Sequence, residues 1–118
     1  MIRLTLPITP LLNRYYRKFR NMIVLSAEAK AYKAEVALIC QQAGVTPLEG
    51  EVLFVAHVYR ARKSGDLDSY LKGLWDSLQG YAYLNDKQIV DLRLTRHDDK
   101  HNPRVEIEIT ELVTPKLI

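Results

Sequence analysis

Residues 51–60 form an uninterrupted β-rich run, which constrains the fold more than any other part of the sequence. Apolar side chains occupy both sets of alternating positions, so both faces of a strand formed here would be covered. Such a strand belongs in the interior of a sheet. We therefore predict a central strand with one face formed by Val52, Phe54, Ala56 and Val58, and the other by Leu53, Val55, His57 and Tyr59.

Three shorter segments have the alternation of half-buried strands. Residues 2–6 alternate apolar and polar side chains and end at Pro7, which cannot continue a sheet ladder. Residues 89–95 and 105–109 alternate in the same way on either side of a polar turn that contains a proline. We expect these last two strands to pair as a hairpin with one wet face, and segment 95–102 to form a polar loop.

Two segments have helical periodicity instead. Ser26 is placed to cap the first helix, which should end at Gly44, and the second should run from Asp66 to Gly80. The resulting order of elements predicts an α/β (α+β) fold, with a small mixed, largely antiparallel sheet and two packed helices. In the first helix, the apolar positions are Ala27, Ala31, Ala34, Val36, Ala37, Leu38 and Cys40.

The composition matches one globular domain spanning residues 1–118, with 47% hydrophobic and 26% charged residues. A net charge of +3 favours an anionic partner, nucleic acid first. The single cysteine, Cys40, cannot form an internal disulfide, so we expect a buried thiol and a reducing compartment. No apolar run approaches the roughly 20 residues that a membrane span needs, and no signal peptide is apparent. We therefore expect a soluble, cytoplasmic protein.

Acidic residues gather around the second predicted helix. Asp66 and Asp68 stand at its start, where both carboxylates can converge on a hard cation, with Mg²⁺ the natural candidate. Asp86 follows the helix after a short loop and could fold back as a third ligand. Asp68, Lys72 and Asp76, spaced four apart, would form one polar line on the helix. The competing structural interpretation is that Asp66 caps the helix and Asp68 pairs with Lys72 on its surface.

The three histidines form no recognisable ligand set. His57 lies in the middle of a predicted strand, whereas His97 and His101 lie in a polar segment. The sequence has no paired cysteines and no His-Glu-x-x-His arrangement, so we assign these histidines no zinc-binding or catalytic role.

Motifs spread over nearly the whole chain resemble those of the RusA family of phage-derived Holliday junction resolvases. Near the N-terminus, Pro10-Leu11-Leu12-Asn13-Arg14-Tyr15 is followed by Ser26 and Tyr32. Most specific is Asp66-Leu67-Asp68-x-x-x-Lys72-x-x-x-Asp76-x-Leu78, followed by Asn85-Asp86-Lys87-Gln88-Ile89-Val90 and by Pro-Arg-Val-Glu-Ile-Glu-Ile at residues 103–109. Two positions depart from the family pattern, because Ser69 stands where the family usually has Asn and Asn85 replaces the first acid of an Asp-Asp pair.

The resemblance implies that Asp66, Asp68 and Asp86 are catalytic, magnesium-binding acids and that Lys72 is the catalytic lysine, with Mn²⁺ able to substitute for Mg²⁺. It also implies a homodimer that makes paired, symmetric nicks in four-way DNA during recombination and repair, in a bacterial or phage-infected cell. Two alternatives stay open: a non-catalytic module that binds branched DNA, and a nuclease that acts on other branched DNA.

Basic residues with interleaved aromatic residues are candidates for the DNA contacts. Tyr15, Tyr16 and Phe19 could stack on bases opened at the crossover, and burial against the sheet or a partner subunit is the alternative for each. The residues that we expect to bind DNA are Arg14, Tyr15, Arg17, Lys18, Arg20, Arg60, Arg62 and Lys63.

Overall fold

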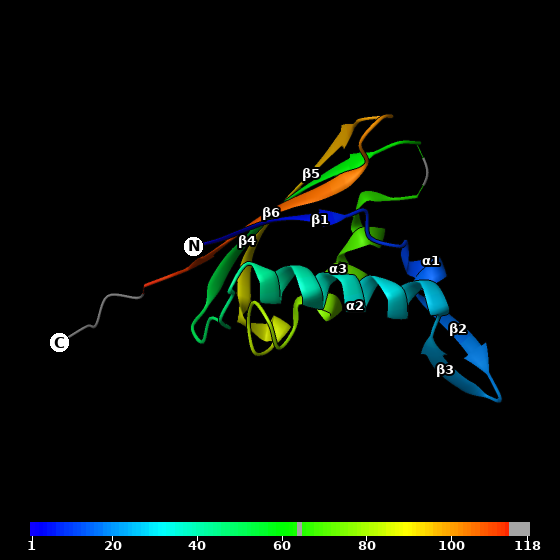
Figure 1. Ribbon diagram of the computed structural model, residues 1–118, viewed down its shortest axis with the longest axis horizontal. Helices are drawn as coiled ribbons and strands as arrows, with labels where there is room; N and C mark the ends of the chain where they lie inside the picture. Colours follow the sequence, from blue (N-terminus) through cyan, green and yellow to red (C-terminus); the bar gives the residue numbers. More distant parts are fainter. Residues whose placement is uncertain (64, 114–118) are drawn as a thin grey trace.

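A four-stranded mixed β-sheet forms the centre of the protein (Figure 1). The computed structural model describes residues 1–63 and 65–113. The strands follow the order β1 (Ile2–Pro7), β6 (Arg104–Glu111), β4 (Val52–Arg60) and β5 (Ile89–Asp98). Strand β4 pairs with β6 on one edge and with β5 on the other, so the predicted central strand is confirmed. The predicted small α+β fold is confirmed as well.

The pairing of β5 and β6 differs from the expected hairpin. Strand β5 runs parallel to β4, whereas β6 is antiparallel to both β4 and β1, so that β4 lies between β5 and β6. The prediction was wrong because alternation fixes which face a strand presents, but not which strand lies beside it. Helix α3 (Leu71–Leu78) connects β4 to β5, as parallel strands require a crossover. Strand β5 also extends to Asp98, so part of the expected loop is strand.

Helices α2 (Ala27–Gln42) and α3 pack on one face of this sheet (Figure 1). The Oγ of Ser26 accepts a hydrogen bond from the backbone N of Ala29 at 3.0 Å, which confirms the predicted cap. The buried side chains of α2 are not the predicted alanine positions. Ala27, Ala31 and Ala34 share the exposed face of the helix, whereas Val36 and Cys40 are buried as predicted, because a side chain as small as that of alanine can lie on either face. The side chains that α2 buries are Ala29, Tyr32, Val36 and Cys40.

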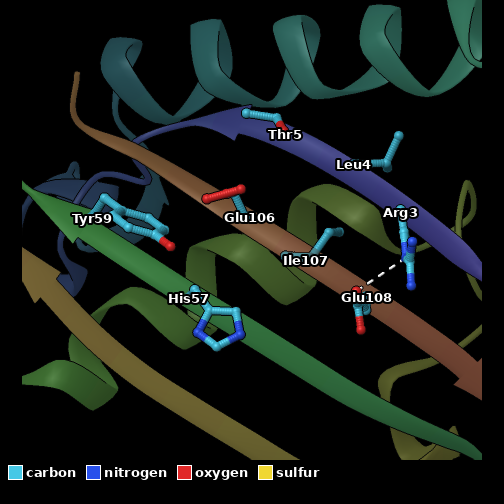
Figure 2. Close-up of a pocket in the computed structure, with 8 residues that line it drawn as sticks. All are labelled: Arg3, Leu4, Thr5, His57, Tyr59, Glu106, Ile107 and Glu108. Carbon is cyan, nitrogen blue, oxygen red and sulfur yellow. Dashed lines mark ion pairs between the residues drawn. The ribbon is translucent and has the colours of Figure 1, made fainter.

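The face of the sheet away from the helices is open, contrary to the prediction that both faces of β4 are covered. Residues of β4 alternate strictly between buried and half-buried. Figure 2 shows His57 and Tyr59 on this face, beside Glu106 and Glu108 of β6, around a depression of about 270 Å³. The Nδ1 atom of His57 lies 3.1 Å from Nε2 of His97, and the rings of Tyr59 and His97 stack. His57 is therefore a hydrogen-bonded strand histidine.

A two-stranded hairpin, formed by β2 (Tyr16–Phe19) and β3 (Met22–Leu25), stands apart from the main sheet and was not predicted. It follows the short helix α1 (Leu12–Tyr15) and projects beyond the end of α2 (Figure 1). Arg20 and Asn21 form its turn with φ values of 49° and 63°. Positive φ at both positions is typical of the tight turns that match strand twist.

Within the described ranges, no helix combines the length and apolar character needed to cross a bilayer.

Candidate active site

Asp66 and Asp68 lie where the chain passes from β4 towards α3. Gly65, just before them, has a φ of 74°, in the left-handed region that favours glycine. Asp66 occupies the cap position of the 3₁₀ turn η1 (Leu67–Tyr70), but its side chain makes no capping hydrogen bond. Both aspartates are exposed. The structure therefore does not support the interpretation of Asp66 as a helix cap.

A surface depression of about 560 Å³ opens beside Asp66. Gly65, Asp66 and Ser69 line one part of it, and residues 11–13 line the rest. Ser69, one of the two departures from the family pattern, is therefore part of this depression. A ligand at this place would contact Asp66 together with the start of α1.

Lys72 and Asp76 form an ion pair on α3, with 3.5 Å between Nζ and Oδ1. The other carboxylate oxygen, Oδ2, accepts a hydrogen bond of 2.7 Å from the hydroxyl of Tyr16. Burial, then the hydrogen bond to Asp76, raises the pKa of Tyr16 to about 12, so the phenol keeps its proton at neutral pH. The predicted polar line is only partly realised, because residues 67–70 form a 3₁₀ turn and Asp68 does not continue the α-helical spacing.

Asp86 lies at the start of the short 3₁₀ helix η2 (Asp86–Gln88) and returns to the end of α3, as predicted. Its backbone N donates to Oε1 of Gln79 at 3.3 Å. Asn85 and Gln88 form a capping box around this turn, in which the Asn85 side chain accepts from the Lys87 backbone. The side chain of Gln88 also donates to two backbone carbonyls near the start of β4. Asn85 therefore has a structural role in holding the loop that carries Asp86.

Tyr83 shows that Asp76 and Asp86 approach the same region. Its side chain is fully buried, and its hydroxyl donates to the Trp75 carbonyl at 2.7 Å. Burial raises the pKa of Tyr83, and the negative charges of Asp86 and Asp76 raise it further. The loop that follows α3 thus places a carboxylate beside the helix.

The carboxylates have the right chemistry for a hard metal ion, but they are not assembled. Among residues 1–63 and 65–113, no three or more His, Cys, Asp or Glu side chains are grouped so that they could hold an ion. Asp66, Asp68 and Asp86 therefore do not form a ready-made trio in the single chain.

The residues predicted to bind DNA divide into an exposed and a buried group. Tyr15 is fully buried, with its hydroxyl 3.1 Å from Oγ of Ser77, so it anchors the hairpin to α3 instead of facing DNA. Arg60 is only 4% exposed, so its side chain lies below the surface and not on it as expected. Residue type indicates charge and ring size, but it does not indicate burial. The exposed group comprises Arg14, Arg17, Lys18, Arg20, Arg62 and Lys63.

The contacts of three residues near the acids were not predicted: Tyr16, which was a candidate for base stacking, Tyr83, and Gln88, which was noted only as part of the motif at residues 85–90. The two tyrosines come close to Asp76 only through tertiary packing, for which the sequence has no local signal. Gln88 does have one, because Asn followed three residues later by Gln is the spacing of a capping box.

Comparison with known proteins places these residues within a length of chain that matches a known family. Residues 6–110 match the family described as endodeoxyribonuclease RusA. The chain is 34% identical over 113 residues to crossover junction endodeoxyribonuclease RusA of Escherichia coli (strain K12), covering 92% of this chain and 93% of that protein. The relatives from Shigella sonnei (strain Ss046) and Enterobacteria phage 82 are each 33% identical over 113 residues, with the same coverage.

Proposed function

From the fact that this chain belongs to the RusA family of endodeoxyribonucleases, we propose that it is a Holliday junction resolvase, which hydrolyses phosphodiester bonds in four-way DNA. The observation that carries this assignment is the match over residues 6–110, which includes Asp66, Asp68, Lys72 and Asp86. The exposure of Asp66 and Asp68 supports it, because acids that neither cap a helix nor enter the core are available to a ligand.

Membership of this family implies a divalent metal ion. We assign Mg²⁺ as the ion, with Mn²⁺ as a substitute, and Asp66, Asp68 and Asp86 as its ligands, because hard ions prefer carboxylate oxygens. The three acids are not grouped in the single chain, so this proposal requires them to move together when the ion binds. The exposed side chains of Asp66 and Asp68 have room to do so.

Lys72 is the proposed catalytic lysine. Its ammonium group either stabilises negative charge on the scissile phosphate or protonates the leaving oxygen. The side chain is 53% exposed, so DNA can reach it, and its ion pair with Asp76 limits where Nζ can lie.

The second half of the proposal is a homodimer that grips the junction. Two subunits related by a two-fold axis would present their sites to two strands of like polarity, and paired, symmetric nicks would follow. The hairpin projects from the body of the subunit (Figure 1), and its exposed basic residues, Arg17, Lys18 and Arg20, are suited to phosphate contacts. Junction binding should therefore weaken steeply as salt concentration rises.

A comparison of substrates tests the proposal. A mobile four-way junction, a fork and a plain duplex are incubated with the protein in Mg²⁺ and in Ca²⁺, and the products are mapped to single nucleotides. We expect paired symmetric nicks in the junction, in Mg²⁺ only. Equal cutting of the fork would identify a nuclease of other branched DNA, and junction binding without nicking in Mg²⁺ would identify a non-catalytic binding module.

A further inference from the structure

A depression of about 220 Å³ lies between the end of β4 and the segment that joins β1 to α1. Three arginines line it, namely Arg14, Arg60 and Arg62, together with Tyr70. Among the described residues of the lining, Glu28 of α2 contributes the one carboxylate. The lining therefore has an excess of positive charge.

Arg60 is the unusual member of this group, because its guanidinium is buried without adequate compensation. The side chain is 4% exposed, and its partner Asp98 is 61% exposed and lies 3.4 Å from Nη2. The Nε atom is buried and has no hydrogen-bond partner within the described part of the chain. A buried charge with a weak partner is costly, and a bound anion would offset that cost.

We propose that this depression, the Arg60 pocket, is a binding site for one phosphate group of the DNA backbone. The planar guanidinium of arginine presents several N–H donors in a geometry that matches phosphate oxygens. Arg14 and Arg62 are exposed at the pocket and add positive charge to that of Arg60. Glu28 and Asp98, the ion-pair partner of Arg60, oppose the anion, and the three arginines outweigh these two acids.

The Arg60 pocket lies next to the depression beside Asp66, so a phosphate bound in the pocket can affect where the DNA is cut. Leu11 lines this pocket and also lines the depression beside Asp66. The two hollows are therefore neighbours that share Leu11 as a lining residue. Resting on the proposed nuclease function, we infer that a phosphate held by Arg60 fixes which nearby phosphodiester bond lies against Asp66.

The test is a double-mutant cycle between protein and DNA. Junctions are made with a neutral methylphosphonate at one position near the crossover at a time, and binding is measured in Ca²⁺, without cutting. For the wild-type protein, one position should lower affinity about tenfold, the effect of losing one charged hydrogen-bond group. With Arg60→Met, affinity for the unmodified junction should fall by a similar factor, and the modification at that position should have no further effect.

Arg62→Gln provides a second variant that does not depend on a buried substitution, and it should show the same coupling more weakly. Arg93→Gln, an exposed arginine on β5, is the matched control and should act independently of every modified phosphate. For both Arg60→Met and Arg62→Gln, the losses of binding free energy caused by the substitution and by the methylphosphonate are compared at every position. If these losses are additive at all of them, the pocket does not hold a backbone phosphate. Because cutting is not measured, this result is independent of whether the protein is a nuclease.

Thermal melting in inorganic phosphate, against chloride of equal ionic strength, distinguishes the source of the anion. If free phosphate stabilises the wild type but not Arg60→Met, and no backbone position couples to Arg60, the site serves a small phosphate and the proposal fails. Melting also checks the fold of the variant. Arg60→Met should not lower the melting temperature, because it removes a poorly paired buried charge and the acid left behind, Asp98, is 61% exposed and stays solvated.

Discussion

The hydroxyl of Tyr16 donates a 2.7 Å hydrogen bond to Oδ2 of Asp76, and this bond joins the β2–β3 hairpin to the helix that carries Lys72. Asp76 is therefore held from two sides, by a tyrosine and by a lysine. Tyr15 strengthens the same connection, because its buried hydroxyl contacts Ser77 of α3. A hairpin that binds DNA would thus be connected through Asp76 to the proposed catalytic lysine.

Replacing Tyr16 with Phe should slow cutting more than it weakens binding. Asp76 would lose one of its two partners, and Lys72 would then be less well positioned. We expect kcat at saturating junction to fall by about tenfold to a hundredfold, with little change in the dissociation constant, since a charged hydrogen bond is worth about 1.5–3 kcal/mol. Single-turnover cleavage and binding in Ca²⁺ measure the two quantities. Tyr59→Phe, on the open face of the sheet, is the control, and an equal loss of activity there would remove the special role of Tyr16.

Replacing Asp68 with Asn should abolish cutting and leave junction binding intact. The amide keeps the size of the side chain but loses the charge that attracts a metal ion, and removing an acid near phosphate relieves repulsion. We expect cleavage to fall by more than about a hundredfold, measured by nicking in Mg²⁺, with binding measured separately. Activity within about tenfold of the wild type would refute the role of Asp68 in metal binding.

Alkaline pH should destabilise the wild type more than Tyr16→Phe. The pKa of Tyr16 is raised to about 12 in the folded protein, from 10.0, so its contribution is complete below about pH 10 and is lost as the pH rises towards 12. Between about pH 10 and pH 12, Tyr16 loses its phenol proton in the unfolded chain but keeps it in the folded protein, so rising pH favours unfolding. Denaturant unfolding at pH 9 and pH 11 measures the effect. The stability of Tyr16→Phe should still depend on pH, because burial also raises the pKa values of Tyr15, Tyr32, Tyr70 and Tyr83.

Replacing Gly65 with Ala should lower cutting, whereas Gly44→Ala should cost stability only. Both glycines have positive φ, so each substitution should destabilise the fold by about 1–2 kcal/mol. A Cβ at Gly65 would also meet Leu11 at 2.8 Å, beside the depression that contains Asp66, whereas one at Gly44 meets nothing within 4 Å. Chemical unfolding and junction cleavage distinguish the two effects. Equal cleavage activity of both variants would show that the position of the Leu11 side chain does not affect cutting.

The elements that follow from local pattern were predicted, and those that depend on tertiary pairing were not. The cap at Ser26, the central strand β4 and the first strand have signals within a few residues. The β5–β6 pairing was wrong because both strands alternate equally well beside each other or beside β4. The hairpin was missed because its turn, Arg20 and Asn21, contains no glycine.

In the candidate site too, features with a local signal in the sequence could be predicted and features that depend on tertiary contacts could not. The return of Asp86 to the end of α3 could be predicted from loop length, and the capping box of Asn85 and Gln88 can be found in the sequence. The bond between Tyr16 and Asp76 could not, because 60 residues separate them. Arg60 was assigned to the surface by its charge, although its side chain is buried at the end of the most apolar strand.

The parallel pairing of β4 with β5 has a consequence for synthesis on the ribosome. Lys72 and Asp76 lie in the crossover between these strands, and Asp86 lies just before β5. The crossover is fixed in place only when the strands at both its ends have paired, which is a late, non-local event in folding. We therefore expect nascent chains that stop before residue 89 to be unable to cut DNA.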